Sequence, residues 1–359
     1  MQELTFIGLD VHARSVKAAL LDGGSGEVTL HSAPPRSEAL VGWICGLPGP
    51  VTVAYEAGPT GYGLARALEQ VGVPCLVAAP SRIERAPADR VKTDRRDALR
   101  LARLLRLGEL TAVRVPSPAE EAARDLMRAR EDARGDLMRA RHRLSKLLLR
   151  QGLLWEGVTW TAAHERWLAE QRFAARPLQI AYQEAFVTMQ GACERRAALD
   201  AAIAVEAGEP RWAEVVGRLA CLRGVSTLTA FGLAVEIGDW QRFSGRSIGA
   251  YLGLVPSESS SGERRRLGAI TKTGNGHARR LLIEAAWHQR RPPWRASHEL
   301  RRRREGQPAA VRARAELANR RLYQRWAAFD GRGKRSTVAA VAVARELAGW
   351  CWSLAIMDE

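Results

Sequence analysis

LTFIGLDVHARSVKAALLDGGSGEVTLHSA, at residues 4–33, holds three short runs rich in apolar side chains. The runs span residues 4–10, 15–22 and 27–33, and a glycine-rich turn at residues 23–26 separates the last two. Adjacent short strands joined by tight turns form antiparallel meanders. The stretch therefore predicts three neighbouring antiparallel strands near the start of the chain.

Helix and strand patterns alternate after this meander. A helix is expected over residues 37–45, a strand over residues 51–56, and a second helix after the turn at residues 58–61. The apolar run at residues 73–79 is typical of a buried strand. Antiparallel strands followed by alternating helices and strands predict an α/β domain with a mixed sheet.

Two of the predicted strands end in a carboxylate, Asp10 and Glu56. Open α/β sheets build their sites at the carboxyl ends of strands. An acidic side chain in that position is costly unless it is paired, hydrogen-bonded or bound to a metal. Both residues are therefore candidates for a functional site. His12 could touch the same site, but a lone histidine is more often a packing residue, and we leave it out of the catalytic set.

Two more carboxylates begin the next predicted helix. Thr93 is the expected N-cap, and Asp94 and Asp97 share one face of the first turn. Acidic residues at a helix start also counter the macrodipole, which is the purely structural interpretation. Together with Asp10 and Glu56 they favour a hard-cation site, because Mg²⁺ is held by a few carboxylates and substrate phosphates.

Residues 117–205 differ from the first part because they form long, amphipathic, charge-laced runs. The first run is interrupted at Gly152, and a second run over residues 162–205 is expected to break near Pro177. Two long helices around a turn predict an antiparallel helical arm. We interpret this arm as a spacer or a dimerisation element rather than as part of the chemistry.

A serine- and arginine-rich stretch, PSESSSGERRRLGAITKTGNG, occupies residues 256–276. Three serines run up to Gly262, and three arginines and Lys272 follow. Hydroxyls beside dense cationic charge on a flexible loop suit phosphate chemistry. The alternative is an ordinary solvated loop, because serine, glycine and arginine are common in loops.

The segments around this stretch are predicted to be helical. Residues 222–230 resemble the hairpin of helix-hairpin-helix DNA-binding elements, and a plain helical hairpin is equally consistent with them. A helix from about His277 is expected to carry arginines on its exposed face. His277 itself is expected to contact phosphate or solvent. A final helix over residues 336–354 is interpreted as core packing.

The charge of the chain indicates a polyanionic partner. The net charge is +16 and the sequence pI is about 10.6. Residues 264–304 hold thirteen Arg and Lys against Glu284 and Glu299. Nucleic acid is the commonest partner of such a surplus, and arginine favours bidentate phosphate contacts.

Cysteine usage and hydropathy bear on the compartment. The five cysteines are far apart and form no CxxC pair, which argues for a reducing compartment and against a structural zinc site. We find no signal peptide and no apolar run approaching the roughly 20 residues that span a bilayer. The expected location is cytoplasmic, without a membrane partner.

The motifs together resemble the insertion-sequence-110 family of DNA transposases, the bridge-RNA-guided serine recombinases. FIGLDVH, VAYEAGPTG and KTDRRDA are similar to the family's N-terminal marks, and AYLGLVPSESSSGERRRLGAITKTGNGHARR is similar to its serine motif. The resemblance covers nearly the whole chain. It implies a RuvC-like, RNase H-type α/β domain at residues 1–115, a helical coiled-coil arm at 116–208 and a mostly α-helical transposase domain at 209–359.

The resemblance also implies the site. The family's magnesium-binding carboxylates match Asp10, Glu56, Asp94 and Asp97. Its nucleophilic serine precedes the glycine of a Ser-Gly step, which is Ser261 here, and the neighbouring Ser260 leaves the assignment open by one residue. A guide RNA that pairs with donor and target double-stranded DNA is implied too. So is a homo-oligomer, a dimer or tetramer, whose subunits share composite sites.

The resulting hypothesis is a DNA transposase that cleaves and exchanges strands through a covalent phosphoserine, with Mg²⁺ as cofactor. The residues expected to bind nucleic acid are Ser260, Arg264, Arg265, Arg266, Lys272, Arg279 and Arg280. One alternative is a Holliday-junction-type nuclease that uses the carboxylates and a water. Another is a non-catalytic nucleic-acid-binding protein. A sugar-kinase-like fold is disfavoured, because Val11 and His12 rather than glycines follow Asp10.

Overall fold

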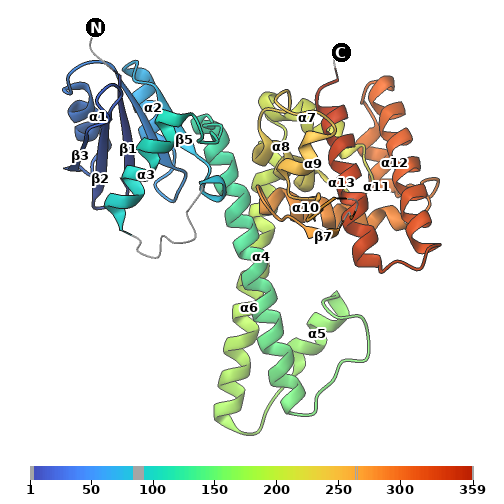
Figure 1. The fold of residues 1–359 in the computed structure, drawn as a ribbon. Helices are drawn as coiled ribbons and strands as arrows, with labels where there is room; N and C mark the ends of the chain where they lie inside the picture. The colour runs from blue at the N-terminus through green and yellow to red at the C-terminus, as the bar shows by residue number, and fades with distance from the viewer. Residues whose placement is uncertain (1–3, 84–92, 263, 265, 358–359) are drawn as a thin grey trace. The chain divides into compact units, whose positions relative to one another are not determined.

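The computed structural model describes residues 4–83, 93–262, 264 and 266–357. The chain divides between Ser117 and Pro118 into two compact units. The first is called the α/β unit and the second the helical unit, and their elements are labelled in Figure 1.

A five-stranded sheet with the strand order β3-β2-β1-β4-β5 forms the centre of the α/β unit. Its strands are β1 (Thr5–Val11), β2 (Val16–Asp22), β3 (Val28–Ala33), β4 (Val51–Glu56) and β5 (Cys75–Ala78). β1, β2 and β3 pair antiparallel, whereas β4 runs parallel to β1 and β5 runs parallel to β4. The predicted meander and the mixed sheet are confirmed.

One face of this sheet carries the main core of the α/β unit. Ile7 and Leu9 of β1 are fully buried there against α1 (Ser37–Cys45) and α2 (Gly63–Gln70). A short 3-10 turn, η1 (Pro80–Arg82), follows the last strand. Because side chains alternate along a strand, the even-numbered positions of β1 point to the opposite face.

The opposite face is covered by α3 (Asp94–Leu107), and here two backbones nearly touch. A Cβ placed on Gly8 would lie 2.0 Å from the carbonyl oxygen of Ala98 and 2.5 Å from the amide nitrogen of Ala102. Only glycine allows this approach. The Thr93 side chain accepts a hydrogen bond from a backbone amide of the first turn, as predicted for the N-cap.

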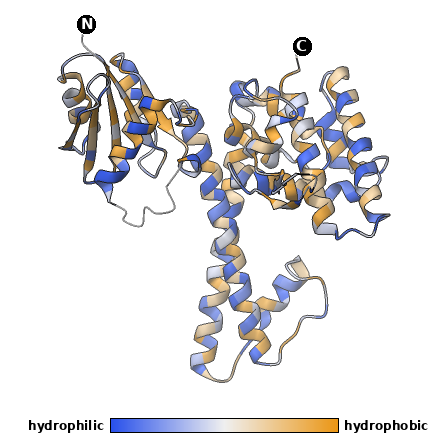
Figure 2. Ribbon diagram, viewed as in Figure 1, coloured by the Kyte–Doolittle hydropathy of each residue, from blue (hydrophilic) through white to orange (hydrophobic). Residues whose placement is uncertain are grey.

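The helical unit begins with the arm, in which α4 (Pro118–Arg150) and α6 (Arg176–Glu206) lie side by side (Figure 1). The short helix α5 (Ala162–Glu170) packs into the same hydrophobic cluster. Hydrophilic and hydrophobic residues alternate along both long helices in Figure 2, and α4 has the clearer amphipathic pattern. Pro177 occupies the first turn of α6, where proline costs no hydrogen bond, so the predicted interruption falls just before it.

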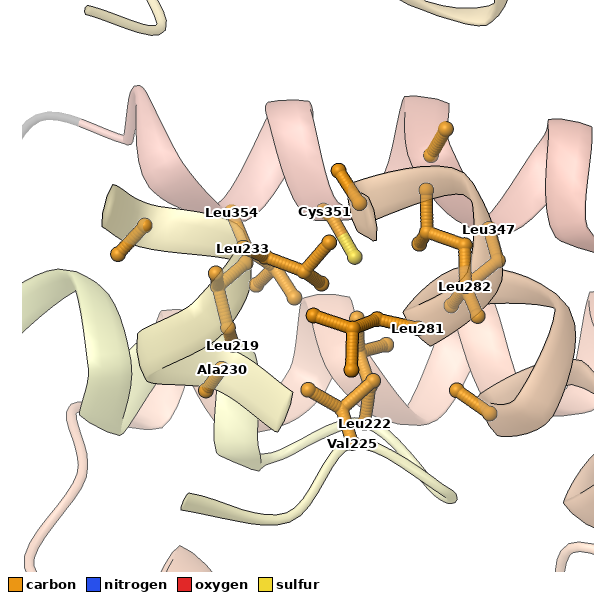
Figure 3. Packing of buried hydrophobic residues seen from close by; sticks show 14 of the residues in the cluster. Leu219, Leu222, Val225, Ala230, Leu233, Leu281, Leu282, Leu347, Cys351 and Leu354 are labelled. Carbon is orange, nitrogen blue, oxygen red and sulfur yellow. The ribbon is translucent and has the colours of Figure 1, made fainter. Parts of the chain in front are cut away.

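The rest of the helical unit is a helical bundle with one small hairpin. Its elements are α7 (Pro210–Ala220), α8 (Thr227–Ile237), α9 (Ser247–Tyr251), β6 (Pro256–Glu258), β7 (Leu267–Ile270), α10 (Gly276–Trp287), η2 (His288–Arg290), α11 (His298–Arg304), α12 (Ala309–Asp330) and α13 (Ser336–Ala355). Leu233, Leu281 and Cys351 come from three of these helices and meet in the core shown in Figure 3.

α13 is long and apolar enough to cross a membrane by length and composition, which the sequence analysis missed. Among the described residues it is the one helix that passes this test. Val343, Leu347 and Leu354 on its inner side are completely buried in the core of the helical unit. The helix therefore serves as a core helix, as its composition predicted, and membrane insertion is not indicated.

Candidate active site

Asp10 lies on the α3 face near the end of β1, where the sheet and the helix meet. It follows Gly8 by two positions, so both residues project toward α3. Its side chain is 21% exposed. The close contact at Gly8 fixes how far α3 stands from β1, and the start of α3 is thereby held near the carboxylate.

A group of three side chains gathers at this point. Ligand atoms of Asp10, His12 and Asp94 all lie within 4.8 Å of one another. The Nε2 atom of His12 is 3.3 Å from Oδ2 of Asp10. His12 is brought back toward the strand by a tight connection, in which its amide donates to the carbonyl of Ser15. The sequence analysis left His12 out of the site, although its spacing of two residues from Asp10 was the available signal.

Asp97 lies one helical turn further along α3. Its carboxylate is 14% exposed and pairs with Arg100 at 3.1 Å. Burial raises the pKa of Asp10, His12 lowers it, and the negative charges of Asp94 and Asp97 raise it again. Three acidic groups are thus close enough to repel one another. A cation would relieve that repulsion, which makes the oxygen-rich cluster a fit for a divalent metal ion.

Glu56 ends β4, the strand next to β1. Leu9 pairs in register with Tyr55, so the positions that follow them, Asp10 and Glu56, are neighbours across the two parallel strands. Alternation places Glu56 on the same face as Asp10. Its side chain is exposed and does not belong to the close group around His12. The structure therefore brings Asp10 and Asp94 together, with Asp97 nearby and Glu56 at the adjacent strand end.

The serine stretch of the helical unit is a β-hairpin, where the sequence analysis predicted a flexible loop. β6 and β7 pair antiparallel. Ser261 and Arg264 close the hairpin by exchanging two backbone hydrogen bonds of 3.2 Å each. Gly262 has a φ of +55°, which a tight hairpin turn requires and glycine supplies without strain. The hairpin went unrecognised because its short strands are exposed and so have no apolar alternation.

The three adjacent serines have different surroundings. The amide of Ser259 donates to the carbonyl of Arg266, and the hydroxyl of Ser260 donates to Glu258 at 2.9 Å. Ser261 is exposed, and no hydrogen bond of its hydroxyl to another described residue is found. Ser259 is equally exposed, and Ser261 differs from it by its place at the turn, where two backbone hydrogen bonds with Arg264 define its position.

The basic residues predicted to bind nucleic acid fall into two groups. Arg264, Arg266 and Lys272 are exposed on or beside the hairpin, and Lys272 has a left-handed φ of +56°. Arg265 lies outside the described residues. We expect the exposed members of this group to be the ones available to a phosphate backbone.

Arg279 and Arg280 form the second group, and they are half-buried instead of lying on an exposed helix face. One guanidinium nitrogen of Arg279 donates to the carbonyls of Leu252 and Thr273, at 2.9 Å each. Arg280 pairs with Glu131 of α4 and, at 2.7 Å, with Glu284. These contacts join the hairpin segment and the arm to α10.

His277 also differs from its prediction, because it contacts a buried carboxylate rather than phosphate or solvent. Its Nδ1 is 3.0 Å from Glu236, which is 2% exposed, and Asn275 donates to the same carboxylate at 2.6 Å. Arg128 lies 3.8 Å away. Burial alone would raise the pKa of Glu236, but the hydrogen bonds from His277 and Asn275 and the charge of Arg128 bring it below its usual value.

Comparisons with known proteins match the two regions separately. Residues 7–151, which hold the carboxylates, match a family model of DEDD-type IS110 proteins described as a transposase. Residues 217–299, which hold the serine hairpin, match the model of the transposase IS116/IS110/IS902 family. The two matches occur in the order that the motifs have along this chain.

Individual relatives carry the same description. A Sinorhizobium fredii protein named as transposase y4qE is 43% identical over 98% of this chain and 88% of its own length. The transposase for insertion sequence element IS1533 of Leptospira borgpetersenii is 33% identical over 93% of this chain and 99% of its own length. A family 20 transposase of Pseudomonas aeruginosa is 28% identical over 66% of this chain.

Proposed function

Because this chain belongs to the IS110 family of transposases, we propose that it moves its insertion sequence by cleaving and exchanging DNA strands through a covalent phosphoserine. The observation that carries the proposal is the cluster of Asp10, His12 and Asp94 in the segment with the DEDD-type match. A second supporting observation is the exposed hydroxyl of Ser261, which lies in the segment with the second family match.

The proposed fold of the α/β unit is the RuvC-like, RNase H type. Three antiparallel strands followed by two parallel ones, in the order β3-β2-β1-β4-β5, support this assignment. So does the position of the first acidic residue, Asp10, near the end of the central strand. The strand ends are where the remaining carboxylates are expected.

The proposed cofactor is Mg²⁺, held by Asp10, Glu56, Asp94 and Asp97. Carboxylate oxygens are the ligands that this ion prefers, and the crowding of like charges around Asp10 fits a cation. When bound, the ion would supply charge stabilisation of the phosphate and a lower pKa for a hydroxyl. The His12 imidazole would fix the orientation of the Asp10 carboxylate through their contact.

The proposed nucleophile is Ser261. Its hydroxyl oxygen would form a bond to a DNA phosphorus, and its proton would leave to solvent. The bond from phosphorus to one deoxyribose oxygen would break, and that oxygen would take up a proton. One phosphodiester replaces another, so rejoining to a second strand requires no nucleotide cofactor. Arg264 and Arg266 would neutralise the phosphate oxygens and position the strand.

The proposed partners are donor and target double-stranded DNA, a guide RNA from the element and further copies of the chain in a dimer or tetramer. The net charge of +16 supports binding of polyanions. Sequencing of RNA that copurifies with the protein from its host would test the guide. A heterogeneous RNA population without a discrete small species would contradict it.

Trapping of a protein–DNA adduct tests the reaction itself. The wild-type chain is expected to form an adduct that survives denaturation on its insertion-sequence ends in Mg²⁺. Ser261→Ala and Asp10→Ala are both expected to lose it, while Ser260→Ala retains it. An adduct in Ser261→Ala would contradict the nucleophile. Cleavage without any adduct would instead favour a metal-dependent nuclease that uses water.

A further inference from the structure

A cavity of about 380 Å³ lies in the helical unit between the α7–α8 turn, the end of α10 and α11. Its lining is strongly basic. The cationic side chains in it are Arg223, Arg291, Arg295 and Arg303, and the imidazole of His288 lies beside them. We call this cavity the arginine pocket, and none of the described residues of the serine hairpin lines it.

Arg223 forms a wall of this pocket and is only 8% exposed. Its guanidinium donates to the carbonyls of Arg291, Pro293 and Arg295 at 2.9–3.4 Å, and it thereby shapes the loop on the other side. Its Nε atom is buried and has no hydrogen-bond partner. Within the described part of the chain no carboxylate pairs with it, and a buried cation without a counter-charge is costly.

The other arginines of the pocket form no ion pair within 4.0 Å with a described carboxylate. Arg303 is half-buried, and its Nε likewise lacks a partner. Arg291 and Arg295 are exposed and form no ion pair with any residue that the structure describes. Burial lowers the pKa of Arg223, and the charges of Arg304 and Arg291 lower it further, which is the signature of cations crowded together.

The two acidic residues of the lining are already engaged elsewhere. Glu284 pairs with Arg280 at 2.7 Å, and Glu299 pairs with Arg302 at 3.4 Å. Neither Arg280 nor Arg302 lines the pocket. Glu299 also acts on Arg303, but the four arginines outnumber the two carboxylates of the lining, so the pocket keeps a positive charge that attracts an anion.

The start of α8 adds neutral donors to the same wall. Ser226 caps this eleven-residue helix and lines the pocket with Thr229. Gly224, with a φ of +78°, turns the chain so closely against α10 that a Cβ would lie 2.3 Å from the carbonyl oxygen of Ala285. Free amides and the macrodipole at a helix start favour negative charge.

We propose that the arginine pocket binds a phosphate of the backbone of duplex DNA. Guanidinium groups and helix-start amides together are the usual phosphate ligands, and the volume accommodates a phosphate with part of its sugar. The choice of DNA rests on the proposed function. The site is separate from the hairpin, so it would position DNA rather than take part in strand cleavage.

Binding of a short labelled DNA duplex by the full-length chain in EDTA tests the proposal. The pocket variant is Arg291→Gln with Arg303→Gln. The matched control, Arg290→Gln with Arg301→Gln, removes the same charge from neighbours that do not line the pocket. The pocket variant should bind roughly tenfold more weakly or worse, with the slope of log affinity against log salt reduced by about 2. The control should change affinity by less than about threefold.

Each contrary result has a distinct meaning. Equal losses in both variants would show a general charge effect and overturn the pocket. A loss confined to single-stranded RNA would overturn the assignment to DNA. If inorganic phosphate raises the melting temperature of the wild type but not of the pocket variant, while duplex affinity is unchanged, the ligand is free phosphate and the DNA proposal fails.

Two features keep the test independent of folding and of chemistry. Arg291→Gln alone changes an exposed side chain, and it should still lower duplex affinity by about threefold or more if the double variant fails to fold. Because binding is measured in EDTA without strand cleavage, failure to trap a serine adduct would leave this proposal standing.

Discussion

The carboxylate cluster and the serine hairpin differ in how firmly the surrounding backbone is supported. Asp10 lies on β1, which has a paired strand on each side and α3 pressed against it at Gly8. Ser261 lies at the end of a two-stranded hairpin whose strands are short and exposed. Isolated hairpins of this kind are marginal by themselves. The carboxylate cluster is thus preformed, while the position of the proposed nucleophile depends on how the hairpin is attached to the neighbouring helices.

The largest expected effect separates the two regions by function. Asp10→Asn and Ser261→Ala should both reduce adduct formation to background, because the proposed reaction needs both groups. Only Asp10→Asn should weaken Mn²⁺ or Mg²⁺ binding measured by calorimetry, by at least the ~10- to 100-fold that loss of a supporting contact costs. Equal metal affinities in the two variants would show that Asp10 is not a ligand.

The next largest effect is expected at Gly8, where β1 packs against α3 in the α/β unit. Gly8→Val should destabilise the α/β unit by about 3 kcal/mol or more, because its side chain would overlap the backbone of α3. Hydrogen exchange of the β1 amides measures this loss. The control is Gly42→Ala in α1, where a Cβ meets nothing within 4 Å and where alanine should stabilise the helix by about 0.5–1 kcal/mol. A tolerated Gly8→Val would mean that α3 can shift freely.

An intermediate effect concerns the attachment of the hairpin. Glu236 holds Asn275 and His277 at the start of α10, and its Gln variant should cost about 2 kcal/mol. The pKa of Glu236 is lowered in the folded state, so its contribution is complete above the ordinary value of 4.5 and disappears as the pH falls through the lowered value. Urea unfolding of both proteins across that range should show the difference shrinking toward acid pH. A difference that grows in acid would contradict the assignment.

The smallest effect is expected at the hairpin tip. Gly262→Ala places a Cβ at a left-handed φ but in open space, so its cost should be about 1–2 kcal/mol and confined to the hairpin. Faster hydrogen exchange of the Ser259 amide would report it, with the β1 amides unchanged. Ser260→Ala serves as the control because it leaves the turn backbone as it is. Spread of the effect into α10 would show that tip and base are coupled.

The sequence predicted those features that local pattern determines. The strands of the sheet, the N-cap at Thr93 and the helix that begins at Ser336 all follow from apolar periodicity and capping chemistry, and the structure confirms them. That Asp10 and Glu56 occupy neighbouring strand ends could also be anticipated, because parallel strands end at one edge of a sheet.

Contacts between distant segments were beyond such reasoning. The approach of Asp94 to Asp10 depends on how closely α3 packs over Gly8, which only the three-dimensional packing determines. The pairing of Glu236 with His277 joins residues 41 positions apart. The sequence did indicate that Glu236 needs a partner, because it is the only charged residue of the apolar helix α8. An isolated charge in such a helix is costly unless it is paired.

The near-contact at Gly8 has a consequence for how such a chain can diverge. The spacing between β1 and α3 is determined by main-chain atoms, and the large hydrophobic cluster lies on the other face of the sheet. Substitutions of Ile7, Leu9 and their neighbours during evolution can therefore occur with little displacement of the acidic residues. Relatives with widely different hydrophobic cores would then keep one arrangement of these carboxylates, provided that position 8 keeps no side chain.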